Sequence, residues 1–276
     1  MESSQSNKIT LLDGAMGTEL QSAGLPQGQL SATWNLEQPE AVIKVHQDYL
    51  KAGSQIIFTN TFGVCDPQLI RAGVELAKYA ITPPSPLGSP PLSLRGGRGE
   101  LIQFAASIGP LDSSKLSDAE ITRHYFQLIS LFLDEGVDMI VLETMINRRE
   151  TLLATESAFK LSSGKTPLMV LMHVNEKARL PDGTEPGLLA QELEGQGASI
   201  LGINCSLTYN AVHQALKSIQ THASCELAVK PAKMGHDFKG WLHQFRPLVS
   251  YIGGCCGTTP EDISLCNALH LADFLQ

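Results

Sequence analysis

The sequence predicts a single (β/α)8 TIM barrel over residues 1–276, and three observations lead to that prediction. Short, apolar runs rich in β-branched residues recur along the whole chain. Turn residues follow each run, and in most cases a longer amphipathic segment comes next. Eight such runs can be counted, which is the number of strands in a closed barrel of alternating strands and helices. A doubly wound open sheet is the alternative arrangement for the same alternation.

The eight runs are apolar nearly throughout, as strands are when both faces of a parallel sheet are buried. They are ITLLD (9–13), IIFTNTF (56–62), FAASIG (104–109), MIVLET (139–144), LMVLMHV (168–174), ILGINCS (200–206), LAVKP (227–231) and SYIGGCC (250–256).

Six segments between or after these runs have the features of helices. The first begins with Pro and ends at Gly, as helix start and stop rules expect. Ser117 and Glu120 form a capping-box pattern ahead of the second. The six predicted helices are 39–53, 121–136, 147–161, 186–197, 210–223 and 260–275.

One stretch departs from the pattern. Residues 82–99 are rich in proline and glycine and cannot form an ordinary helix. Residues 74–80 before them suffice for only about two helical turns. We therefore expect a shortened second helix followed by an irregular, exposed insert, and no second domain.

Composition excludes several classes of function. The net charge is −8 and no run of Lys or Arg occurs, which argues against a nucleic-acid partner. No apolar stretch reaches the roughly 18 residues of a membrane span. The polar N-terminus, MESSQSNK, lacks the apolar core of a signal peptide, so we expect a cytoplasmic protein. In that reducing compartment the six cysteines are not a disulfide framework.

Polar residues collect at the carboxyl ends of the predicted strands, where the active site of an α/β barrel lies. One face of the barrel should therefore carry two carboxylates, three thiols and several hydrogen-bonding groups. These strand-end residues are Asp13, Asn60 with its two threonine neighbours, Ser107, Glu143, His173, Asn175, Cys205, Cys255 and Cys256.

The three thiols at this face suggest a zinc site. Thiolates are soft ligands, and three protein ligands leave a fourth position open for a substrate. Adjacent strand residues point to opposite faces, so we expect the nearby glycines to provide the dihedral angles that turn Cys255 and Cys256 to one side. Burial as small apolar side chains at a tight turn is the simpler alternative. It is the expected role of Cys65, Cys225 and Cys266, none of which ends a strand.

The two carboxylates also have more than one possible role. Either Asp13 or Glu143 could cap a helix or pair with an arginine. If both carboxylates lie beside a thiolate–metal site, they would together suit a cationic group such as the ammonium of an amino acid. His173 could line the pocket or pack in the barrel, whereas His46 and the other histidines of helical segments are expected to be ordinary.

Six motifs in order along residues 9–263 resemble the homocysteine S-methyltransferase family. They are LLDGAMGTEL (11–20), TNTFG (59–63), SIGP (107–110), LETM (142–145), GINCS (202–206) and GGCCGTTPEDI (253–263).

The resemblance implies a (β/α)8 barrel with Zn²⁺ bound by Cys205, Cys255 and Cys256 and the homocysteine thiol in the fourth position. It implies that Asp13 and Glu143 hold the amino group of homocysteine. The amides of the turn that starts at Gly14 would meet the carboxylate of homocysteine, and the substrate site would include two further residues, Asn60 and Ser107. The expected reaction is methyl transfer to the zinc-activated thiol of homocysteine, giving methionine.

The methyl donor is left open by the resemblance. The donors in the family are S-methylmethionine, S-adenosylmethionine, betaine and a methylated corrinoid. The residues of these motifs are similar to those in the homocysteine module of cobalamin-dependent methionine synthases. We expect no corrinoid domain to follow this barrel. A small molecule or a separate methyl-corrinoid protein would therefore supply the methyl group. The family's Asn after the seventh strand is missing from Lys230-Pro231-Ala232. Three functions therefore remain: the methyltransferase, a catalytically silent zinc-binding barrel that serves as a scaffold, and an enzyme for another thiol or a selenol.

Overall fold

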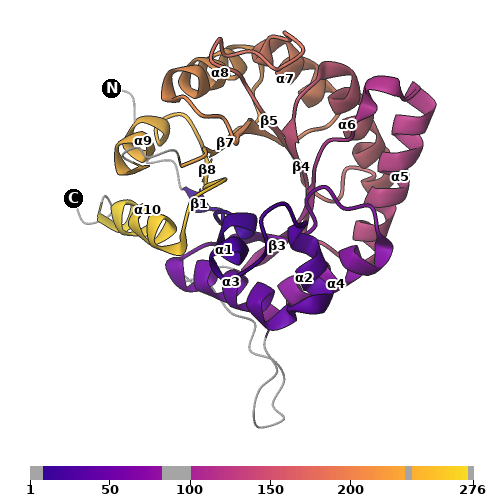
Figure 1. The fold of residues 1–276 in the computed structure, drawn as a ribbon. Helices are drawn as coiled ribbons and strands as arrows, with labels where there is room; N and C mark the ends of the chain where they lie inside the picture. The colour runs from indigo at the N-terminus through magenta and orange to yellow at the C-terminus, as the bar shows by residue number, and fades with distance from the viewer. Residues whose placement is uncertain (1–8, 83–100, 234–237, 273–276) are drawn as a thin grey trace.

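The computed structural model describes residues 9–82, 101–233 and 238–272, which form one barrel of eight parallel strands. Figure 1 shows the helices as a ring outside the strands. Each strand pairs with its neighbours along the chain, and a bridge between Leu12 and Ile56 links the first strand to the second. The predicted (β/α)8 barrel is confirmed, because an open doubly wound sheet would not have this sequential order.

All eight predicted strands are present, several of them shorter than the apolar runs. They are β1 (Thr10–Leu11), β2 (Ile56–Phe58), β3 (Gln103–Ile108), β4 (Met139–Met145), β5 (Leu168–Met172), β6 (Ile200–Asn204), β7 (Glu226–Lys230) and β8 (Tyr251–Ile252).

The six predicted helices also occur, together with elements that the pattern did not indicate, namely α1, α2, α9 and two short 3₁₀ helices. The helices are α1 (Met16–Ser22), α2 (Trp34–Glu37), α3 (Pro39–Ala52), α4 (Pro67–Ile81), α5 (Asp118–Asp134), α6 (Arg148–Ser162), α7 (Pro186–Gly195), α8 (Tyr209–His222), α9 (Phe238–Phe245) and α10 (Pro260–Ala272), and the 3₁₀ helices are η1 (Ser31–Thr33) and η2 (Ser113–Lys115). None of the helices in the described part of the chain is long and apolar enough to cross a membrane.

The prediction of a shortened second helix was wrong. α4 has 15 residues, because it begins well before the apolar segment 74–80 that suggested it. The Asp66 carboxylate accepts hydrogen bonds from the amides of Gln68 and Leu69, and Pro67 occupies the first helical position, which is a strong start signal. The insert expected at 82–99 lies outside the described residues apart from Thr82.

The strand alternation places the site. One apolar cluster fills the inside of the barrel and includes Ala105, Val141 and Ala228, while their strand neighbours pack outward against the helices. Because side chains alternate along a strand, the residues two positions later also point inward. Those residues are Ser107, Glu143 and Lys230, three polar side chains at the carboxyl end of the barrel.

Candidate metal and substrate site

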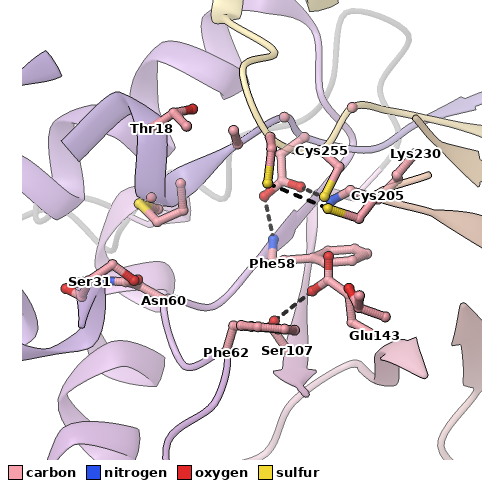
Figure 2. A pocket seen from close by; sticks show the side chains of 18 of the residues that line it. Thr18, Ser31, Phe58, Asn60, Phe62, Ser107, Glu143, Cys205, Lys230 and Cys255 are labelled. Carbon is pink, nitrogen blue, oxygen red and sulfur yellow. Dashed lines mark hydrogen bonds and ion pairs between the residues drawn. The ribbon is translucent and has the colours of Figure 1, made fainter. Parts of the chain in front are cut away.

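A cavity of about 410 Å³ opens at the carboxyl ends of the strands (Figure 2). The structure brings all eight predicted site residues to its wall, although they come from six strand ends far apart in the sequence. They are Asp13, Gly14, Asn60, Ser107, Glu143, Cys205, Cys255 and Cys256. His173, whose position was left open, is not among the residues that line this cavity.

The sulfur atoms of Cys205, Cys255 and Cys256 all lie within 4.8 Å of one another, and those of Cys205 and Cys256 are 3.4 Å apart. In the described residues this is the only such group of potential metal ligands. A tetrahedral metal with bonds of about 2.3 Å to sulfur holds its sulfur ligands roughly 3.8 Å apart. The spacing and the donor type therefore fit a soft cation such as zinc.

The backbone that gathers the three sulfurs differs from the expectation. Cys205 itself has a left-handed φ of 51°, an uncommon conformation for a residue with a side chain. Of the glycines around Cys255 and Cys256, only Gly257 has a positive φ, of 77°. Gly253 is required by space instead, because a Cβ atom there would lie 2.6 Å from the carbonyl oxygen of Asp13. At this site one of the three cysteines, Cys205, therefore has a left-handed backbone conformation, and among the flanking glycines only Gly257 has a positive φ.

The three thiols differ in pKa. Hydrogen bonds from the Cys205 and Cys255 thiols lower the pKa of Cys256 to about 3. The same network of hydrogen bonds, together with burial, raises the pKa of Cys255 well above its ordinary value. One thiolate therefore forms readily, and a cation is needed before all three thiols can ionise.

Asp13 has a partner that the sequence analysis did not include in the site. Its Oδ1 lies 2.6 Å from the Nζ of Lys230, and its Oδ2 accepts a hydrogen bond of 2.7 Å from the amide of Phe58. The Lys230 ammonium also lies 3.5 Å from the centre of the Phe58 ring. Burial alone would lower the pKa of Lys230, but the carboxylates of Asp13 and Glu143 outweigh it and hold that pKa above its ordinary value. Side chains alternate between the two faces of a strand, so Lys230 points inward like Ala228, two residues before it. This alternation was the signal that could have identified Lys230 as a site residue.

Glu143 is held from two sides. Its Oε2 accepts a hydrogen bond of 2.7 Å from the Ser107 hydroxyl, and its Oε1 accepts one of 3.3 Å from the Asn204 amide. Burial raises the pKa of Glu143, while Lys230 and the Ser107 hydrogen bond oppose that shift. With its carboxylate buried and aimed at the cavity, Glu143 suits a cationic group of a ligand.

Asn204 is a second residue that the sequence analysis missed. Its side chain accepts the amide proton of Thr144 at 3.0 Å and donates to the Thr144 hydroxyl at 2.8 Å. Thr144 has a φ of 61°, and the pairing of β4 with β5 is irregular between Leu142 and Met145. Asn204 therefore supports the bulge in β4 that carries Glu143.

Two further predicted residues have visible structural roles. The polar side-chain atoms of Asn60 bond to Ser31 and Asn35, which attaches the end of β2 to the segment before α3. Gly14 is required because a Cβ atom would lie 2.7 Å from the Tyr49 ring. Their roles in substrate binding stay predictions.

Fold and site together define a class of protein: an α/β barrel with three cysteine sulfurs at the spacing of metal ligands, beside a cavity whose buried charges suit a small amino acid. Comparison with known proteins narrows the class. The chain belongs to the homocysteine S-methyltransferase family, whose model matches residues 10–269.

Two relatives differ in how much of them the chain covers. It is 29% identical to the homocysteine S-methyltransferase of Escherichia coli over 304 residues, covering 94% of both chains. It is 24% identical to a methionine synthase of Mycobacterium tuberculosis, and the match covers 94% of this chain but only 24% of that protein. The chain thus spans about a quarter of the length of the methionine synthase.

Solved structures agree with the family assignment. The metallated form of the homocysteine methyltransferase MmuM from Escherichia coli superposes with a TM-score of 0.79 at 27% identity, covering 96% of this chain and 97% of that one. The apo form of the same protein gives 0.76 at 28% identity, covering 96% of both chains.

Proposed function

We propose that this chain transfers a methyl group to the thiol of homocysteine, giving methionine, with Zn²⁺ held by Cys205, Cys255 and Cys256. The observation that carries the proposal is the convergence of three sulfurs within 4.8 Å beside the buried carboxylate of Glu143. Family membership over residues 10–269 and the metallated state of MmuM support it.

The proposed chemistry divides between the metal and the chain. When bound, zinc would keep the homocysteine thiol deprotonated at neutral pH, and a thiolate is the reactive nucleophile. Glu143 and Asp13 would receive the ammonium group, which orients the thiol toward the three cysteines. The methyl carbon would move to sulfur in an in-line displacement, in which the donor leaves with the electron pair of the broken bond. No proton has to be removed in that step, so Glu143 binds and orients rather than acting as a base.

Electrostatics favour a small cationic donor. Three thiolates and two carboxylates would face the cavity, and bound Zn²⁺ together with Lys230 would oppose their five negative charges with only three positive ones. A sulfonium or quaternary ammonium group, as in S-methylmethionine, S-adenosylmethionine or betaine, would gain from that excess of negative charge. The match to methionine synthases supports a second candidate, in which a methyl-corrinoid protein delivers the methyl group to this barrel.

A donor panel tests the proposal. Zinc-loaded protein receives homocysteine with S-methylmethionine, S-adenosylmethionine, betaine or methylcobalamin, and methionine is quantified by mass spectrometry. We expect methionine with at least one sulfonium donor and none from the Cys205→Ala variant, which should also lose zinc. A protein with stoichiometric zinc that yields no methionine from any donor would instead be the silent scaffold. Cysteine and selenocysteine as acceptors separate homocysteine specificity from general thiol or selenol methylation.

A further inference from the structure

The segment from Lys230 to Lys233 contacts the backbone of all three cysteines. The amide of Cys205 donates to the carbonyl of Lys230 at 3.0 Å, and the amide of Cys255 donates to the carbonyl of Pro231 at 2.9 Å. The amide of Lys233 donates to the carbonyl of Cys256 at 2.8 Å. These four consecutive residues, from the last residue of β7 onward, thus join the end of β6 to the loop after β8, and the sulfurs come from these two places.

Each end of this segment is anchored by a lysine ion pair. At the first end the ammonium of Lys230, which is labelled in Figure 2, forms an ion pair with Asp13, and both residues line the cavity. At the other end the Lys233 ammonium lies 2.7 and 2.6 Å from the two carboxylate oxygens of Asp262, in the first turn of α10. The Asp262 side chain is 7% exposed and that of Lys233 is 33% exposed, so the pair is partly shielded from water.

Asp262 links the same ion pair to the far side of the cysteine loop. Its Oδ2 accepts a hydrogen bond of 3.0 Å from the amide of Thr259, directly before α10. Gly257, inside the loop, has no room for a side chain, because a Cβ atom would lie 2.9 Å from the Lys233 carbonyl. The loop that carries Cys255 and Cys256 is therefore held between the segment and the start of α10.

The two residues between the lysines provide no side-chain hydrogen bonds. Pro231 and Ala232 are both buried, and neither side chain has a polar atom. Apart from the backbone hydrogen bonds to the three cysteines, the polar side-chain anchors of the segment are therefore at its two ends. Lys230 also reaches the substrate cavity, whereas Lys233 does not line it.

We propose that Lys233 and Asp262 are positioning residues for the metal centre: their ion pair fixes the segment Lys230–Lys233, and through it the spacing of the three cysteine sulfurs. The inference rests on the proposed zinc site and adds a part of this chain that acts on the metal without contacting it. Groups outside the ligand set that orient metal ligands commonly change metal affinity by about 10- to 100-fold when they are removed.

Lys233→Met tests the inference, because it removes the charge and keeps most of the side-chain length. Zinc release to a chromogenic chelator is followed in zinc-loaded wild type and variant, and cobalt-substituted proteins are compared by their sulfur-to-cobalt charge-transfer and d–d absorption bands. We expect release about tenfold faster in Lys233→Met and altered d–d bands. Asp262→Asn should behave alike, and Lys233→Arg should restore most of the wild-type release rate. Lys44→Met is the matched control, since Lys44 pairs with Asp48 on the exposed face of α3 and should change neither readout.

A purely structural ion pair would give a different result. Lys233→Met would then lower the unfolding temperature but keep the wild-type release rate and cobalt spectrum, and this result would overturn the inference. Zinc binding by the wild type is the first measurement of the series. A wild type that binds no zinc would refute the proposed function, and the inference with it, whereas normal zinc binding with an unaffected Lys233→Met would refute the inference alone.

Discussion

His46 lies in α3 with no solvent exposure, and neither of its ring nitrogens has a hydrogen-bond partner among the described residues. Burial lowers its pKa to about 4, from an ordinary value of 6.5. His46 was expected to be ordinary, although the spacing of the buried residues Val42, Val45, Tyr49 and Ala52 places it on the inward face of the helix. The helical period could therefore have identified it as a buried histidine, which burial keeps in the neutral form.

This histidine predicts a loss of stability in mild acid. Between pH 6.5 and 4 the unfolded chain binds a proton at His46 that the folded protein does not, so the free energy of unfolding falls as the pH falls. The loss at pH 4 is roughly 3 kcal/mol from this group, and above pH 7 the contribution is absent. Denaturant unfolding of wild type and His46→Leu across this range measures it. The variant should show the flatter pH dependence, and two parallel curves would contradict the assignment.

The elements of the barrel differ in how well the sequence predicts them. Apolar runs identified every strand, because buried parallel strands lack polar interruptions. The bulge at Glu143 and Thr144 left no such trace, since it depends on hydrogen bonds to Asn204, which belongs to another strand. α4 was underestimated for a local reason: its start is defined by the capping residues at 66 and 67 rather than by apolar period.

The β4 bulge should link stability to substrate binding. Asn204→Ala removes both hydrogen bonds that support the left-handed Thr144 and one that holds Glu143, so we expect the free energy of unfolding to fall by about 2 kcal/mol. The KM for homocysteine should rise roughly tenfold, which corresponds to about 1.4 kcal/mol of weakened ammonium binding. Steady-state kinetics and denaturant unfolding measure the two effects.

Asn147→Ala is the control for this bulge. Asn147 caps α6 and does not line the cavity, so its loss should destabilise the protein without changing KM. If Asn204→Ala lowers stability and leaves KM at the wild-type value, Glu143 does not depend on the bulge for its position.

At the scale of the whole molecule, the strand pairings that close the barrel are short. β1 and β8 share two residue pairs, and β1 meets β2 through one isolated bridge, whereas the pairings from β3 to β7 are longer. The sequence predicted eight strands and, from thiols at strand ends, which face carries the site. It could not predict the partners that ion pairs and backbone hydrogen bonds select in three dimensions, such as Lys230 for Asp13.

Metal removal should first loosen the part of the barrel where β8 pairs with β1. A metal on Cys205 and Cys255 would cross-link the ends of β6 and β8, so chelation should loosen the last strand and the loop that follows it. Hydrogen–deuterium exchange should accelerate by about tenfold or more in residues 250–259, a change of about 1.4 kcal/mol in local opening, and stay unchanged in β3 to β5. Uniform acceleration along the chain would show that the metal stabilises the fold as a whole and not this region.

The left-handed conformation of Cys205 has a consequence for how this barrel can change in evolution. A non-glycine residue in that region carries a conformational cost of about 1–2 kcal/mol, which glycine would avoid. Selection for folding alone would therefore favour glycine at position 205, and only selection for the sulfur opposes that change. In a descendant of this barrel that no longer bound a metal, Cys205→Gly would therefore remove the conformational cost without losing a cross-link, and the substitution would be difficult to reverse once the rest of the fold had adapted to it.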